Sequence, residues 1–331
     1  MDTKPDAAAG GDLRGWPLAA SPFHAGEQAA QERAGKRAWS EAAGRRAVRA
    51  HMPVQHREFF AQLPCLLLGA LDAEGQPWAT MLAGVPGFVQ APDPYHLNIG
   101  AGLLPADPLD GALQAGSDVG MLGIELQSRR RNRVNGRIEA IGPDGLQVAV
   151  SQSFGNCPRY IQLRAVRTVA PAPLPAWRGG RLDEAAQDLL RRADTAFIAT
   201  YHRAAGEPAT GGADVSHRGG KPGFLRVDGD GTVTFPDFNG NAYFNTIGNL
   251  LARPQAGLLV PDFEDGTLLH VGGSAEVIWD GPELAGFAGA ERLVRIHVER
   301  VLRRPGVLPL RWDFQDWSPA LAATGSWPAP A

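Results

Sequence analysis

The stretch Gly84-Val85-Pro86-Gly87-Phe88 returns 136 residues later as Gly220-Lys221-Pro222-Gly223-Phe224. Further out, two more pairs of segments match at an offset of 137 residues: 119–122 with 256–259, and 136–141 with 273–278. A nearly constant offset over this length of chain indicates that one fold is duplicated in tandem. Because duplicated folds often pack on each other as the subunits of a dimer do, we expect the functional site at the seam between the copies.

The composition sets the broad class of the protein. With 331 residues, of which 44% are hydrophobic and 20% charged, the chain can bury two cores of ordinary domain size. A net charge of -3 gives no global attraction for nucleic acid or for an anionic membrane. Two isolated cysteines, Cys65 and Cys157, fit a reducing compartment. No apolar run is long enough to span a membrane, and residues 1–15 do not resemble an export signal, so we expect a cytoplasmic protein.

Each copy reads as many short strands with one small helix, which predicts a small β-barrel rather than a parallel sheet with crossovers. The fold class is therefore mainly β with a few helices. We expect helices at 108–114 and 242–252 at corresponding places in the two copies, and one surface helix over 27–49. Five segments follow: a leader and helix (1–50), a first repeat with a degenerate anion site (51–167), a proline-rich linker (168–182), a second repeat with the main groove (183–305) and an arm (306–331).

The candidate anion site lies in the second copy. Asp214-Val215-Ser216-His217-Arg218 leads into two glycines, and we expect Val215 to point into the barrel. The guanidinium of Arg218 is a planar fork of donors suited to phosphate. The matching first-copy stretch, residues 79–84, carries no charge. Taken alone, this stretch is equally consistent with a solvated hairpin tip.

A second element, Phe235 to Asn241, precedes the predicted helix at 242–252 and includes Asp237. We expect Asn241 to cap that helix, with Asn245 and Thr246 in its first turns. Helix N-termini present unpaired amides and hold phosphate well. An ordinary capped helix remains the alternative explanation of this element.

A third element is the loop 153–161, which contains Cys157 and Arg159. A lone cysteine is more often a packed small side chain than a nucleophile. The run 129–137 holds five arginines; it lacks interleaved aromatic residues, which favours a solvated hairpin or a cationic wall facing an anion over nucleic-acid binding. The eight histidines form no metal-spaced cluster, so no metal site is expected.

Together, the segments 216–224, 236–241, 244–250 and 153–161 resemble the pyridoxamine 5'-phosphate oxidase-like family, in particular its predicted flavin-nucleotide-binding branch. The resemblance implies a pair of split barrels with FMN at their interface, here as a pseudo-dimer of the two repeats. It implies that Asp214 to His217 line the flavin ring, that Arg218, Asn245 and Thr246 lie on the phosphate side, and that the loop 153–160 reaches across the groove. FMN is preferred to FAD or a deazaflavin.

One departure from the family bears on function. The oxidases proper carry an Arg-Lys pair where this chain has Asn245-Thr246, so the phosphate charge must be met elsewhere, by Arg218 or by the run 129–137. We therefore expect an FMN-dependent oxidoreductase with a small-molecule substrate or an electron donor such as NAD(P)H, and name no catalytic residue. The alternatives are a non-catalytic protein that stores or senses flavin, and a flavin-free barrel pair that binds a partner through its basic hairpin. Further association of two such chains stays open.

Overall fold

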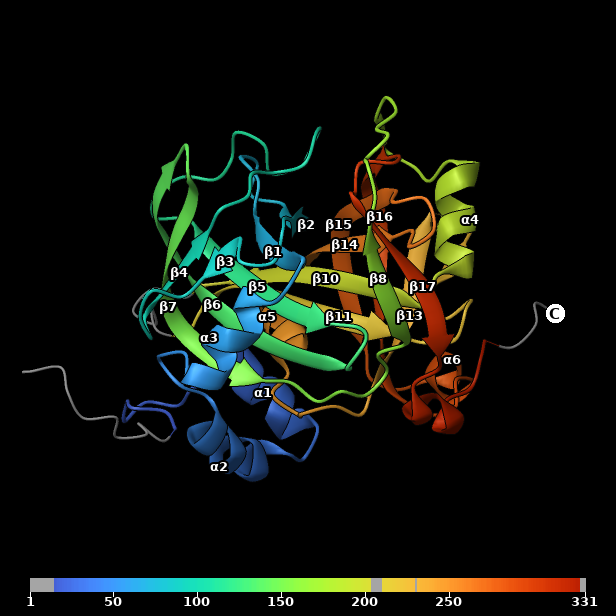
Figure 1. Ribbon diagram of the computed structural model, residues 1–331. Helices are drawn as coiled ribbons and strands as arrows, with labels where there is room; N and C mark the ends of the chain where they lie inside the picture. The colour runs from blue at the N-terminus through green and yellow to red at the C-terminus, as the bar shows by residue number, and fades with distance from the viewer. Residues whose placement is uncertain (1–14, 204–209, 230, 328–331) are drawn as a thin grey trace, which may run out of the picture.

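Two sheets with the same strand order dominate the computed structural model, which describes residues 15–203, 210–229 and 231–327 (Figure 1). The first fourteen residues of the expected leader and residues 328–331 of the arm lie outside the described residues. The first sheet runs β2 (Pro77–Ala83), β1 (Cys65–Leu71), β5 (Asp118–Glu125), β6 (Arg130–Gly142), β7 (Gly145–Gly155), β4 (His96–Ile99), β3 (Val89–Gln90). The second runs β11 (Gly212–Gly219), β10 (Thr195–His202), β14 (Gln255–Pro261), β15 (Leu268–Ile278), β16 (Ala290–Arg304), β13 (Thr232–Phe238), β12 (Arg226–Asp228).

When the strands of each copy are numbered from its first strand, both sheets have the order 2-1-5-6-7-4-3. The aligned glycines also play the same part in each copy. The register between β6 and β7 shifts at Gly136, and the register between β15 and β16 shifts at Gly273. Such bulges bend a sheet at a defined point. The duplication predicted from the sequence offset is therefore present in the fold.

Smaller elements join and cover the two sheets. β9 (Trp177–Gly179) extends the second sheet beside β16, and β8 (Leu163–Thr168) pairs with β17 (Leu310–Asp316). Between β8 and β9, residues 169–176 form neither helix nor strand, as expected of a segment with three prolines. The helices are α1 (Ala25–Arg33), α2 (Arg37–Ala47), α3 (Val54–Ala61), α4 (Glu184–Arg192), α5 (Asn245–Ala252), α6 (Pro282–Ala285) and the 3-10 turn η1 (Pro319–Ala323).

Three helix predictions need correction. The single helix over 27–49 is two helices, because the chain turns at Gly35 with φ +65°. No helix forms over 108–114; residues 100–117 are turns, in which Gly111 and Gly116 take positive φ. The helix expected at 242–252 begins only at Asn245; the N-cap position is held by Phe244 in the left-handed region, not by Asn241, and it carries no side-chain cap. Asn241 instead accepts a hydrogen bond from the Tyr243 amide, which makes a turn before the helix.

The two repeats meet face to face, and the contact is symmetric. A methyl group built on Gly120 of β5 would lie 2.6 Å from the Ala213 carbonyl oxygen, and one built on Gly257 of β14 would lie 2.1 Å from the Pro77 carbonyl oxygen. Each residue of the second contact is the repeat equivalent of one in the first. Only glycine allows strand backbones to approach this closely. The repeats therefore pack as a pseudo-dimer.

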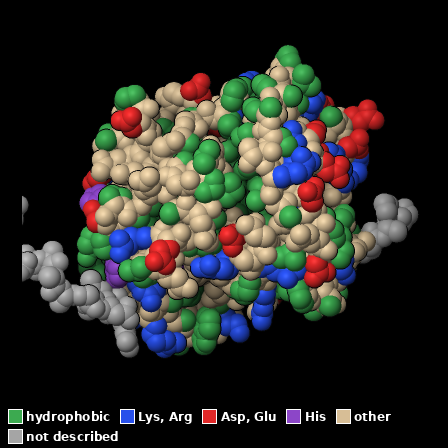
Figure 2. Space-filling model, in the orientation of Figure 1, with side chains coloured by type: hydrophobic (Ala, Val, Ile, Leu, Met, Phe, Trp, Pro, Cys, Tyr) green, Lys and Arg blue, Asp and Glu red, His purple; other side chains and the backbone are tan. Residues whose placement is uncertain are grey.

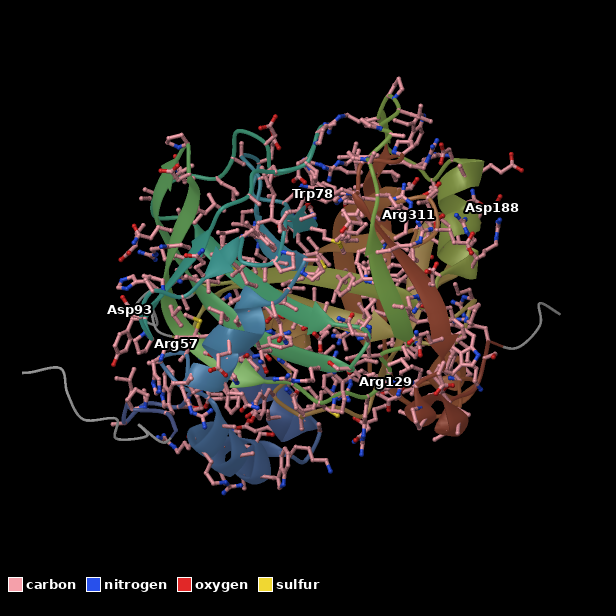
Figure 3. The ribbon with its side chains drawn as sticks, in the orientation of Figure 1. Arg57, Trp78, Asp93, Arg129, Asp188 and Arg311 are labelled. Carbon is pink, nitrogen blue, oxygen red and sulfur yellow. The ribbon has the colours of Figure 1, made fainter. Side chains whose placement is uncertain are left out.

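Side chains from both copies fill the seam between the glycine contacts. This seam cluster includes Leu67, Met81 and Leu122 from the first repeat and Phe197, Val215 and Leu259 from the second, all nearly fully buried. Each repeat also has a separate core of its own. Trp78 lies at the junction of the repeats in Figure 3, and its ring would meet a methyl group on Gly272. Burial of this kind stabilises by about 1.5–3 kcal/mol per large apolar side chain, so the repeats are held together mainly by the hydrophobic effect.

The surface carries both signs of charge. Figure 2 shows basic and acidic side chains interspersed over the face in view. None of the helices in the described ranges has the length and apolar character that crossing a membrane requires.

Candidate functional site

Strand β11 supplies one wall of the site, and its alternation decides which side chains reach it. Asp214 and Ser216 point to one face, toward Arg133 of the first repeat. Val215 points to the other face and packs in the seam cluster, not in the core of its own barrel as expected. A strand directs successive side chains to opposite faces, so this wall is set by the strand itself.

Arg133, on β6 of the first repeat, crosses the seam to the second. Its guanidinium forms an ion pair with Asp214 at 2.9 Å and donates to the Val215 carbonyl oxygen at 2.8 Å, to the Ser216 hydroxyl at 2.6 Å and to the Asn245 amide oxygen at 2.8 Å. Both partners of the ion pair are about 4% exposed. Burial lowers the pKa of Arg133, and the Asp214 carboxylate opposes that shift. This residue therefore joins the two repeats at the site.

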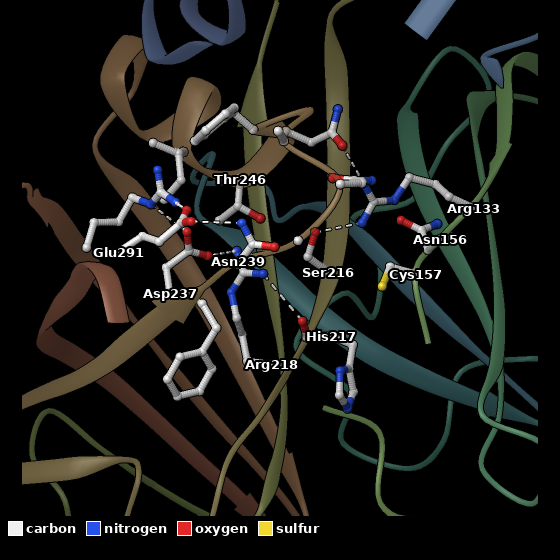
Figure 4. A pocket seen from close by; sticks show the side chains of 18 of the residues that line it. Arg133, Asn156, Cys157, Ser216, His217, Arg218, Asp237, Asn239, Thr246 and Glu291 are labelled. Carbon is white, nitrogen blue, oxygen red and sulfur yellow. Dashed lines mark hydrogen bonds and ion pairs between the residues drawn. The ribbon is translucent and has the colours of Figure 1, made fainter. Parts of the chain in front are cut away.

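A cavity of about 110 Å³ opens beside Arg133, and both repeats line it (Figure 4). The first repeat contributes Arg131, Asn156 and Cys157 in addition to Arg133. The second contributes β11, the segment after β13 and the start of α5, and Lys36 reaches the cavity from the N-terminal helices. A second cavity of about 60 Å³ adjoins it across Arg218 and is lined by Arg159 and Tyr160.

Five buried polar atoms of residues that line the cavity have no hydrogen-bond partner within the described ranges. They are Nε of Arg133, the amide nitrogen of Asn156, Nε2 of His217, Nε of Arg218 and the hydroxyl oxygen of Thr246. Buried polar groups are nearly always paired, because an unpaired one costs about 1–3 kcal/mol. Five such atoms around one cavity indicate that a polar ligand completes their hydrogen bonding.

The charge of the lining favours an anion. It includes five cations, namely Lys36, Arg131, Arg133, Arg218 and Arg292, against the two carboxylates of Asp237 and Glu291. Asp237 is shared between Arg292 at 2.7 Å and Arg218 at 3.4 Å. Burial, together with neighbouring cations, lowers the pKa of Arg131 to about 9. For the same reasons the pKa of His217 lies well below its usual value, so this ring is neutral at pH 7.

The start of α5 faces the same cavity. Its first-turn amides have no acceptors within the helix, and no side chain of the described residues caps this end. Thr246, 2% exposed, adds its unpaired hydroxyl. The side-chain amide of Asn245 is held by Arg133 and by Glu27 of α1. Burial raises the pKa of Glu27 to about 8.

Most of the residues singled out from the sequence meet here. The main cavity is lined by Cys157, Ser216, His217, Arg218, Asp237, Asn241, Asn245 and Thr246. Arg159 lines the adjoining cavity, while Asp214 lies buried behind Arg133 and Val215 lies in the seam cluster. Sequence reasoning missed Lys36, Glu27, Glu291 and Arg292, for which no local pattern stood out. It interpreted the basic run as either a solvated hairpin or a cationic wall, and Arg131 and Arg133 of that run line the cavity.

The corresponding place on the other side of the pseudo-dimer is filled by protein. His270, the repeat equivalent of Arg133, bonds the Ala79 carbonyl oxygen at 3.0 Å, as Arg133 bonds that of Val215. The guanidinium of Arg304 enters behind it and bonds Asp107 at 2.8 Å and the Leu104 carbonyl oxygen at 2.8 Å. Arg304 and Asp107 are fully buried. The first copy's counterpart of the cavity is thus an internally paired network.

Metal-ligating side chains do not gather anywhere in the described ranges in a set of three or more. Guanidinium, ammonium, amide, hydroxyl and imidazole groups outnumber the carboxylates of Asp237 and Glu291 at the seam cavity, and this set suits an organic anion.

Comparison with known proteins finds a family match for the second repeat. Residues 182–313 match the family model described as pyridoxamine 5'-phosphate oxidase. No curated protein matches the chain. Among solved structures, HupZ from Group A Streptococcus is 18% identical and matches 36% of this chain and 91% of its own, with a TM-score of 0.29.

Two further structures give similar values. A pyridoxamine 5'-phosphate oxidase-like protein from Lactobacillus delbrueckii is 19% identical over 37% of this chain and 94% of its own, with a TM-score of 0.30. HutZ, a heme storage protein from Vibrio cholerae, is 17% identical over 38% of this chain and 96% of its own, with a TM-score of 0.27. These values carry no argument about function. The family match covers residues 182–313 alone, so it is the second repeat that is similar to the pyridoxamine 5'-phosphate oxidase family.

Proposed function

We propose that the protein binds FMN in the seam cavity and is an FMN-dependent oxidoreductase that takes electrons from a small-molecule donor such as NAD(P)H. The observation that carries the proposal is the set of five unpaired polar atoms around a cavity with a cationic lining. This set fits a phosphorylated, hydrogen-bonding cofactor. The family match over residues 182–313 supports a flavin in particular.

The residues divide into two groups around the ligand. The Thr246 hydroxyl and the uncapped amides of α5 suit the phosphate, because a helix N-terminus favours anions. Ser216, His217 and Arg218 on β11 suit the polar edge of the ring. When bound, the flavin supplies the electron transfer, while the protein binds it, orients it and excludes water.

The cavity is too small to hold a whole flavin as it stands. Volumes of about 110 and 60 Å³ are below the roughly 300–1,000 Å³ of ordinary ligand pockets, so a whole flavin enters only when side chains move. Arg218 is the side chain we expect to move, because its two contacts, to the His217 carbonyl oxygen and to Asp237, are both 3.4 Å long.

The test is the visible absorption spectrum of the purified protein, before and after FMN is added, and then after anaerobic addition of NADH or NADPH. We expect flavin bands that bleach with the donor. Arg218→Ala should weaken FMN binding about tenfold, more than the ~0–1 kcal/mol of an ordinary surface charge, because a charge-assisted contact is lost. Wild-type protein that takes up no FMN contradicts the proposal, and an unchanged affinity removes Arg218 from the site.

A second candidate is flavin binding without turnover. The same small volumes favour it, because they leave little space for a second substrate beside a bound flavin. Flavin bands that appear on loading but do not bleach with either donor would select this function.

A further inference from the structure

We propose that Lys36, from the N-terminal helix pair outside both repeats, supplies the cation for the phosphate group of the bound ligand. This inference rests on the proposed function. The phosphate needs a cation near the start of α5, where Asn245 and Thr246 are both uncharged.

The fold holds Lys36 beside the start of α5. The chain turns at Gly35, and the Lys36 amide donates to the Gln31 carbonyl oxygen at 2.8 Å. The Gln31 side chain donates to the Tyr243 carbonyl oxygen at 3.1 Å, and the Ser40 hydroxyl donates to the Ala242 carbonyl oxygen at 2.7 Å. These two carbonyls belong to the residues just before α5. The break between α1 and α2 therefore places Lys36 at the cavity.

Contacts at the N-terminal start of α1 also hold this helix against α5. His24 bonds the Asn249 side chain at 2.9 Å, and Gly26 packs so closely that a methyl group there would lie 2.4 Å from the Gly248 carbonyl oxygen. Glu27 bonds Asn245. Both ends of α1 are thus fitted against α5 and the residues just before it, and Lys36 follows the second of these ends.

Lys36 also has charge to offer. In the part of the chain that the structure describes, its ammonium has no carboxylate partner, whereas Arg133 is paired with Asp214 and Arg292 with Asp237 and Glu291. The charges of Arg133 and Arg292 are therefore already balanced by carboxylates. An unpaired ammonium at the rim binds a phosphate dianion without first breaking an ion pair. Arg131 is the other lining cation that has no carboxylate partner among the described residues, and it is held by its bond to the Cys157 carbonyl oxygen of the first repeat.

FMN and riboflavin provide the test, because they differ by the phosphate alone. Their dissociation constants are measured by flavin fluorescence titration of wild type and three variants: Lys36→Met, Lys36→Arg and Arg46→Met. Arg46 lies on α2, is exposed and does not line the cavity, so it controls for general charge. We expect Lys36→Met to weaken FMN about fivefold and leave riboflavin unchanged, Lys36→Arg to restore FMN, and Arg46→Met to change neither.

Each other result overturns the inference. Equal weakening of FMN and riboflavin by Lys36→Met means that Lys36 acts only through the docking of the helices. No weakening of FMN means that Lys36 does not meet the phosphate. If wild type binds neither flavin, the proposed function itself fails, and the inference fails with it; if wild type binds FMN and Lys36→Met binds it equally well, only the inference fails.

Discussion

The seam can be tested by adding a single methyl group. In Gly257→Ala the new carbon would lie 2.1 Å from the Pro77 carbonyl oxygen and 2.9 Å from the Cα atom of Trp78, both of them backbone of the other repeat. The φ angle of Gly257 is one that alanine adopts freely, so the change adds no strain within its own strand. Any effect therefore reports the contact between the repeats.

The magnitude follows from the geometry. To reach ordinary van der Waals distance the strands must separate by roughly 1 Å, and no flexible side chain can absorb the shift. Overpacking of this kind costs about 1–3 kcal/mol, and contact with backbone places the expected loss near 3 kcal/mol. Gly120→Ala, at the equivalent contact, starts from 2.6 Å and should cost less. Gly142→Ala, where a methyl group meets nothing within 4 Å, serves as the control.

Urea unfolding followed by tryptophan fluorescence measures the free energy of unfolding of the three variants. We expect the loss to decrease in the order Gly257→Ala, Gly120→Ala, Gly142→Ala. If Gly257→Ala unfolds at the same urea concentration as wild type, the repeats do not pack as described, and the placement of Arg133 against Asp214 is wrong as well.

The remaining predictions concern the buried charges and the two-repeat site. Arg304→Met should destabilise the fold by about 3–5 kcal/mol because it leaves the Asp107 carboxylate buried and unpaired; adding Asp107→Asn should recover part of that in urea unfolding, and full additivity would refute the pairing. Burial raises the pKa of Glu27 from 4.5 to about 8, so the folded state holds a proton that the unfolded state loses. The stability that Glu27 contributes should be complete below pH 4.5 and fall by about 1.4 kcal/mol per pH unit up to about pH 8, a slope absent from Glu27→Gln in unfolding measured across that range. Residues 183–331, produced without the first repeat and the proline-rich linker, should bind FMN more weakly than the whole chain, since Arg131 and Arg133 are then missing; equal affinity as a monomer would contradict a shared site.

Most of the fold could be predicted from local sequence patterns. The repeated glycine motifs, the short strands and the proline-rich segment after β8 could be read from the sequence because turn chemistry and strand alternation act over a few residues. Helix bounds were less secure. The segment 108–114 lacks a helix because its glycines take positive φ and Asp107 is drawn into the network of Arg304, a contact made almost 200 residues away.

The sequence by itself determined that the chain holds two copies of one β fold, and it led us to expect an anion near Arg218, Asn245 and Thr246 of the second copy. Only the tertiary structure decided that Arg133 and Lys36 reach the same cavity, and that Arg304 fills the opposite one. The physical reason is that a motif consists of neighbouring residues, whereas a site between two repeats depends on how their sheets pack against each other. That packing depends on Gly120 and Gly257, which lie 137 positions apart and whose contacts with the other repeat no local pattern reveals.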